Sequence, residues 1–149
     1  MKKIIVLLLL STITYISCEK AEKETDKIEI AKKFYVAIDN SNHSKVTGLI
    51  TEEFTTIDDG YEQKYVQNKY AEWVKWDSVF QPTYEILKIE KDDDIVKAKI
   101  SKIDKRISFL HDQPIIMNET ILFDGDRIVL NELLYPSTSK NLLNAEMNL

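Results

Sequence analysis

The feature that most constrains the fold of this chain is the stretch from Asn118 to Tyr135. Two apolar runs, Thr120–Phe123 and Ile128–Leu130, are joined by Asp124-Gly125-Asp126-Arg127. Asp-Gly between apolar runs is a strong signal for a tight β-hairpin, because these residues tolerate the positive φ angles that such turns need. The stretch therefore predicts the core hairpin of a β-sheet, whereas nothing in it identifies a reaction.

The length and charge of the chain suit one acidic domain. The chain has 149 residues, with 20 basic and 25 acidic side chains and a net charge of −5. About 130 residues remain if an N-terminal targeting segment is removed, which is enough to bury one hydrophobic core. An acidic surface disfavours nucleic acid, because that binding needs a basic patch to release phosphate counterions. We therefore expect a single domain that does not bind nucleic acid.

The first 17 residues have the pattern of an export signal. Positive charge at Lys2 and Lys3 is followed by the apolar run Ile4–Leu10, which is too short to span a bilayer. A small residue then precedes Cys18, the only cysteine in the chain. The segment resembles a bacterial lipoprotein signal, which implies that Cys18 is lipidated and becomes the mature N-terminus. Tyr15 stands where that pattern prefers leucine, so an ordinary secretory signal stays open.

These features divide the chain into four parts. Residues 1–17 form the signal, 18–26 a polar tether, 27–136 the folded domain and 137–149 a C-terminal tail. More than one acyl chain would anchor the domain stably to the cell envelope, on its periplasmic or its outer side. A single cysteine excludes disulfide frameworks and cysteine zinc sites. The apolar residues Leu142, Leu143 and Met147 suggest that the tail adds a short helix or packs on a partner subunit.

The spacing of apolar residues predicts an α+β fold. Helical spacing predicts helices over residues 27–39, 44–50 and 63–80, the last ended by Pro82. Alternating or continuous apolar runs predict strands over 53–58, 84–91, 95–104, 107–110, 115–123 and 127–135. Helices first and then a meander of strands indicate a curved antiparallel sheet that wraps around about three N-terminal helices.

Three stretches together resemble the nuclear transport factor 2-like superfamily, with the SnoaL-like and ketosteroid-isomerase-like branches closest. They read FYVAIDN at 34–40, LITEEF at 49–54 and ILFDGDRIV at 121–129. The resemblance covers about Lys27 to Tyr135, and it implies a cone-shaped domain with a pocket between the first helix and the concave face of the sheet. Some members of that superfamily are isomerases, dehydratases or cyclases, and many others bind or assemble without catalysis.

The isomerase-like branch implies three catalytic candidates in this chain. Tyr35 matches an oxyanion-stabilising tyrosine, Asp59 a general base and Glu119 a protonated acid that shares the oxyanion. A carboxylate base and two neutral O–H donors in a dry pocket would stabilise a developing enolate. Each residue also has an ordinary role open to it: Tyr35 in the core or pocket wall, Asp59 in the turn before Gly60, and Glu119 on a strand face in water.

Aromatic residues on the first and third predicted helices are candidates for the pocket wall, namely Phe34, Tyr70 and Trp73. The only histidines, His43 and His111, are too few and too far apart in the sequence to form a recognisable ligand set. We therefore expect neither a metal nor a cofactor.

Three functions stay open from the sequence. The first is a lipid-anchored domain that binds a small apolar ligand or a protein partner without doing chemistry. The second is a cofactor-independent isomerase, dehydratase or cyclase, which requires Tyr35, Asp59 and Glu119 to converge on one cavity. The third is a structural subunit that forms a homodimer through a sheet face, which an exposed apolar strip would favour.

Overall fold

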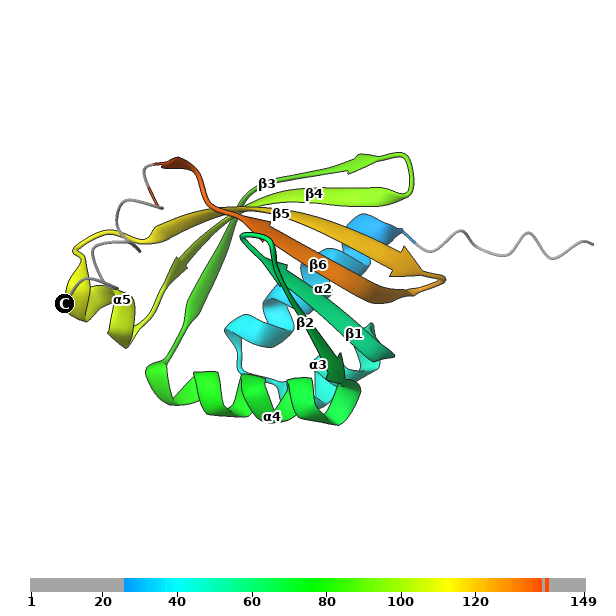
Figure 1. Cartoon of the computed structure of the whole chain (residues 1–149), viewed down its shortest axis with the longest axis horizontal. Coiled ribbons are helices and arrows are strands. Elements are labelled where there is room, and N and C mark those ends of the chain that lie inside the picture. The colour runs from blue at the N-terminus through cyan, green and yellow to red at the C-terminus, as the bar shows by residue number, and fades with distance from the viewer. Residues whose placement is uncertain (1–25, 138, 140–149) are drawn as a thin grey trace, which may run out of the picture.

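The computed structural model of the protein describes residues 26–137 and 139. The predicted signal, Cys18 and the greater part of the tail lie outside the described residues. Within them, no helix combines the length and the apolar character needed to cross a membrane. A curved six-stranded sheet and its helices form an α+β domain (Figure 1), which confirms the predicted fold class.

The elements follow one another in a simple order along the chain. The N-terminal half contains helices α2 (Lys27–Asp39) and α3 (His43–Leu49), strands β1 (Ile50–Asp58) and β2 (Tyr61–Val66), helix α4 (Gln67–Asp77) and the 3-10 helix η1 (Ser78–Phe80). The C-terminal half contains strands β3 (Thr83–Asp92) and β4 (Ile95–Ile103), helix α5 (Lys105–Leu110), and strands β5 (Ile115–Asp124) and β6 (Arg127–Leu134).

The predicted hairpin is formed by β5 and β6 and lies in the middle of the sheet. The strand order is β2-β1-β6-β5-β4-β3, and Gly125 adopts a φ of 59° in the turn between β5 and β6. Neighbouring strands are antiparallel except for β1 and β6, which run parallel. This single parallel pair is feasible because the long chain segment between β1 and β6 serves as the crossover connection.

The predicted start of the third helix was wrong. Gln63 to Val66 belong to strand β2, where Gln63 pairs with Thr56 and Val66 with Glu53 across the β1–β2 hairpin. The helix was predicted in part because the apolar residues Val66 and Tyr70 are four residues apart, which is helical spacing. An even spacing of four also occurs on one face of a strand, so it does not distinguish the two. The turn at Asp59-Gly60 decides between them, because it returns the chain alongside β1 before the helix begins.

The predicted strand over residues 107–110 was also wrong, because this segment lies in helix α5. The Asp104 carboxylate accepts hydrogen bonds from the backbone N–H groups of Arg106 and Ile107 at 2.8 and 2.9 Å. Such a side-chain cap satisfies donors that the first turn of a helix leaves unpaired. Capping by Asp104 therefore favours a helical turn in a segment whose apolar run alone resembles a strand.

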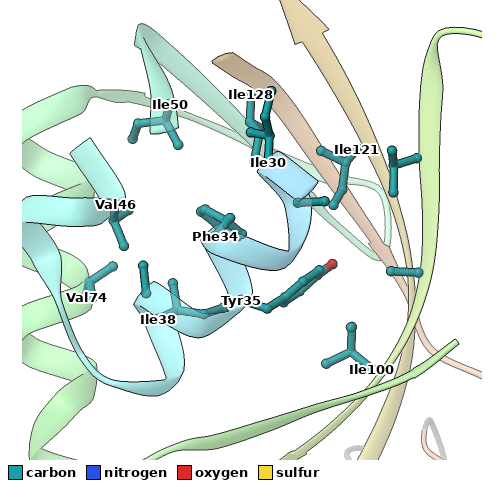
Figure 2. Close-up of a cluster of buried hydrophobic side chains, with 14 of the residues drawn as sticks. Ile30, Phe34, Tyr35, Ile38, Val46, Ile50, Val74, Ile100, Ile121 and Ile128 are labelled. Atoms are coloured by element: carbon teal, nitrogen blue, oxygen red, sulfur yellow. The ribbon is translucent and has the colours of Figure 1, made fainter. Parts of the chain in front are cut away.

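Helix α2 packs along the concave side of the sheet and supplies much of the core. Its buried residues are Ile30, Ala31, Phe34, Tyr35, Ala37 and Ile38. Figure 2 shows Phe34 and Tyr35 leaving this helix in different directions, with the Tyr35 hydroxyl at the tip of its ring. The Asp39 carboxylate accepts a hydrogen bond of 2.7 Å from the backbone N–H of Tyr84, which ties the end of α2 to β3.

We predict that Phe54→Ala lowers the free energy of unfolding by about 3 to 5 kcal/mol. Phe54 is fully buried on β1 and contacts Phe34 and Tyr70 with its ring, so truncation leaves a cavity in the core. Urea denaturation measures the effect. The control is Glu53→Ala at the exposed neighbouring position of the same strand, which should change stability by no more than about 0.5 kcal/mol. Equal effects of both substitutions would contradict this description of the core.

Candidate functional site

A cavity of about 650 Å³ lies between helix α2 and the concave face of the sheet. Residues from all six strands and from helices α2, α4 and α5 line it. The strand contributions alternate, as with Ile115, Met117 and Glu119 on β5, because every second side chain points to the same face. The geometry therefore gives one chamber whose walls are assembled from distant parts of the chain.

One wall of the cavity is aromatic. Phe34, Tyr70 and Trp73, the residues that the sequence suggested for a pocket, all line it. The Tyr70 ring is stacked with those of Trp73 and Phe34, with centroid distances of 5.4 and 6.5 Å. Tyr65 meets Tyr70 edge to face at 5.3 Å. Such a wall offers flat apolar surface to a bound molecule.

A buried carboxyl group, that of Glu119, faces the cavity from β5. Only 4% of Glu119 is exposed, and its Oε2 accepts hydrogen bonds from Tyr35 Oη at 2.9 Å and from Asn131 Nδ2 at 2.7 Å. Glu119 and Asn131 line the cavity, whereas Tyr35 is absent from its lining and contacts the carboxyl group from the core. Tyr35 therefore holds Glu119 in position.

Burial controls the protonation of this group. Desolvation raises the pKa of Glu119, and the opposing hydrogen bonds from Asn131 and Tyr35 do not cancel that effect. Burial likewise raises the pKa of Tyr35 well above its usual range, and the negative charge of Glu119 adds to this. The neutral carboxylic acid is therefore favoured more strongly at Glu119 than at an exposed glutamate.

Asp59, the predicted general base, does not line the cavity. It is exposed in the turn between β1 and β2 with a φ of 48°, and its backbone N–H donates to the Leu133 carbonyl at 3.0 Å. The preceding residue, Asp58, does line the cavity. Of the three catalytic candidates, Tyr35 and Glu119 are hydrogen-bonded to each other. Glu119 is the one candidate that lines the cavity, and Asp59 lies outside the lining. Their catalytic roles stay predictions.

Asp58 is a site residue that the sequence analysis missed, although its signal was present. Alternation from the buried Phe54 through Thr56 predicts that Asp58 points to the same side of β1. Asp58 also forms a side-chain hydrogen bond with Tyr135. Burial foremost, and then the charge of Asp58 and this hydrogen bond, raise the pKa of Tyr135.

Lys102, Asp104 and Arg106 also line the cavity, and together with Asp77 they form a charged cluster that the sequence analysis did not predict. Arg106 forms ion pairs with the buried carboxylates of Asp77 and Asp104, and Lys102 Nζ lies 3.5 Å from Asp77 Oδ2. The Arg106 guanidinium also lies over the Phe80 ring, 4.0 Å from its centroid. Burial raises the pKa of Asp104, but the hydrogen bonds from Arg106 and Ile107 outweigh it, so the net shift is downward. The positive charges of Lys102 and Arg106 therefore offset the negative charges of Asp77 and Asp104.

The part of the chain that the structure describes contains no group of His, Cys, Asp and Glu side chains arranged to hold a metal ion.

No protein-family model matches the chain, and no curated protein matches its sequence. Solved structures do match its fold. One is a nuclear transport factor 2-like protein of unknown function from Cytophaga hutchinsonii, with a TM-score of 0.63, 10% identity and coverage of 80% of this chain and 98% of the other. Another is SalBIII, an epoxide hydrolase/cyclase-like enzyme of pyran ring formation in the polyether salinomycin, with a TM-score of 0.66, 13% identity and coverage of 78% and 95%.

A third similar structure has a ketosteroid isomerase-like fold, comes from Catenulispora acidiphila and was solved in complex with trimethylamine. Its TM-score is 0.59, its identity 16%, and the match covers 74% of this chain and 88% of the other. At such low identities the likeness concerns the fold alone. It agrees with the resemblance that the three sequence stretches carry.

We predict that Glu119→Gln gains stability relative to the wild type as the pH rises from about 4 to about 8. The pKa of Glu119 is higher in the folded protein than in the unfolded chain. Its contribution to folding stability is therefore fully present below the unfolded pKa of about 4.3, and it is lost as the pH rises through the folded pKa. Glutamine keeps an acceptor for Tyr35 and Asn131 but has no proton to lose. Urea denaturation across this pH range measures the difference.

The matched control is Glu85→Gln on strand β3, where the side chain is exposed. Its stability curve should run parallel to that of the wild type. Parallel curves for Glu119→Gln as well would mean that burial does not perturb this carboxyl group.

Proposed function

We propose, from the nuclear transport factor 2-like fold of this chain, that its domain binds a small and mainly apolar molecule in the cavity without transforming it. The observation that carries the proposal is the composition of the cavity, which is lined both by an aromatic wall and by a buried, hydrogen-bonded carboxyl group. Ligand sites of this kind are concave and mostly apolar, with a few fixed polar groups that orient the ligand. A volume of about 650 Å³ suits a small molecule.

The positions of the catalytic candidates favour binding over catalysis. The Tyr35 hydroxyl donates to Glu119, so its proton is engaged in the core and not directed at the cavity. Asp59 is exposed in a turn outside the cavity lining. A base and two donors aimed at one reacting carbonyl, as enolate chemistry requires, are therefore not assembled from these three residues.

The proposal includes attachment of the domain to the bacterial cell envelope through lipids on Cys18. Its support is the positively charged start, the short apolar run and the single cysteine that ends it. Mainly apolar molecules partition into membranes, because water disfavours their surface. An anchored domain would therefore stand close to the compartment in which such ligands concentrate.

A second candidate function, a cofactor-independent isomerase or cyclase, is favoured by one observation. Asp58 lines the same cavity as Glu119, and its charge adds to burial, the main cause of the raised pKa of Glu119. Asp58 would act as the base that removes a proton next to a carbonyl, while Glu119 would donate a hydrogen bond to the carbonyl oxygen. The cyclase-like enzyme SalBIII has a similar fold.

To test the binding proposal, we would titrate the protein with N-phenyl-1-naphthylamine, an uncharged dye whose emission rises in apolar surroundings. We predict saturable binding to the wild type and at least a tenfold loss of affinity for Leu133→Trp. Leu133 lines the cavity from β6, so a larger side chain there occupies the ligand's space.

The matched control is Leu134→Trp, because Leu134 is the next residue on β6 and is 45% exposed outside the cavity lining. Its affinity for the dye should equal that of the wild type. Circular dichroism checks that both variants are folded. Absence of dye binding to the wild type, or an equal loss in both variants, would count against the proposal.

The enzymatic candidate is tested by hydrogen exchange of 2-tetralone, an enolisable bicyclic ketone, in deuterated water. If Asp58 is a base, the wild type accelerates replacement of the α-hydrogens by deuterium, followed by nuclear magnetic resonance. Asp58→Asn should then lower the rate about 100-fold or more, and Asp59→Asn should leave it unchanged. A wild-type rate equal to that of buffer would exclude this activity for the ketone.

A further inference from the structure

The amide of Asn131 contains an acceptor that the described protein does not satisfy. Asn131 is 5% exposed and lines the cavity beside Glu119. Its Nδ2 donates to Glu119 Oε2, whereas its buried Oδ1 accepts no hydrogen bond from the described residues. Buried polar atoms without a partner are rare in folded proteins, because each has lost its hydrogen bonds to water without replacing them. This oxygen therefore points to a donor that a ligand supplies.

The neighbouring carboxyl group has complementary chemistry. The hydrogen bonds that Glu119 accepts from Tyr35 and Asn131 both end on Oε2. When the acid is neutral, its proton is best placed on Oε1, because Oε2 already accepts two donors. Burial of Glu119 favours this neutral form. Since Glu119 lines the cavity, its neutral acid would offer a donor to a molecule bound there.

We infer that the ligand of the cavity carries a hydroxyl group on an apolar skeleton, and that this hydroxyl donates to Asn131 Oδ1 and accepts from Glu119. This inference rests on the proposed binding function and names its ligand class, an alcohol or phenol. A hydroxyl both donates and accepts, so it matches the pair of protein groups. A ketone or ether only accepts and would leave Asn131 Oδ1 without a donor. A cationic amine only donates and would leave the acid proton without an acceptor.

The test compares three bicyclic probes of similar skeleton by equilibrium dialysis: 2-naphthol, 2-methoxynaphthalene and naphthalene. 2-Naphthol has a donor, the methyl ether has only an acceptor, and naphthalene has neither. We expect the wild type to bind 2-naphthol at least tenfold more tightly than either of the other two probes. If affinity depended only on transfer from water to an apolar site, 2-naphthol would not bind most tightly, because burying its hydroxyl without a partner is costly.

The variant Asn131→Leu, which has a similar shape but no amide, should reduce this preference to about twofold or less. If that variant does not fold, the comparison of the three probes on the wild type decides by itself. Equal or weaker binding of 2-naphthol relative to naphthalene or the ether would overturn the inference and leave the binding proposal intact. Failure of all three probes and of the dye to bind would overturn the binding proposal itself.

Discussion

The structure depends on one buried carboxyl group that is shared by three elements. Glu119 on β5 receives hydrogen bonds from Tyr35 on α2 and Asn131 on β6, residues 84 and 12 positions away in the chain. Hydrophobic burial drives α2 onto the sheet but is not directional. A buried polar group is directional, because it is costly unless its partners have the correct geometry. The triad therefore fixes which face of α2 meets the central hairpin.

A second polar network fixes the other elements around the cavity. Asp104 follows strand β4, caps helix α5 and binds Arg106, while Arg106 reaches Asp77 at the end of α4. Removing one member would leave a charge buried without its partner, which is more costly than the pair is stabilising. Lys102, Asp104 and Arg106 of this network line the same cavity as Glu119 and Asn131.

The sequence predicted the parts of this fold that depend on local periodicity. The Asp124-Gly125 hairpin and the helix that begins after Asp26 have signals within a few residues, and both are found. The errors at residues 63–66 and 107–110 fall on segments of four residues, where strand and helix spacing cannot be told apart. There the decisive contacts come from a partner strand or from a capping side chain outside the segment.

The candidate site was predictable only in part, for a related reason. Alternation along β5 places Glu119 on the same face as Ile115, Met117 and Ile121, so its burial follows from the pattern. Family resemblance predicted Asp59 as the base, whereas Asp58, the last residue of β1, lines the cavity and Asp59 lies in the turn that follows. Ion pairing between Asp77 and Arg106 has no local signal, because it depends on how α4 and α5 meet.

The same carboxyl group thus serves the fold and lines the cavity, so the proposed binding would be coupled to stability. A ligand that satisfies Asn131 Oδ1 stabilises the folded state, because binding to the native form alone shifts the folding equilibrium. The oxygen that lacks a partner is tolerated because the remaining contacts of Glu119 and Asn131 hold both side chains in place. Natural proteins depart from full hydrogen bonding most often where function requires it. The unsatisfied amide oxygen of Asn131 is therefore the feature that most directly supports the proposed ligand site over a packing defect.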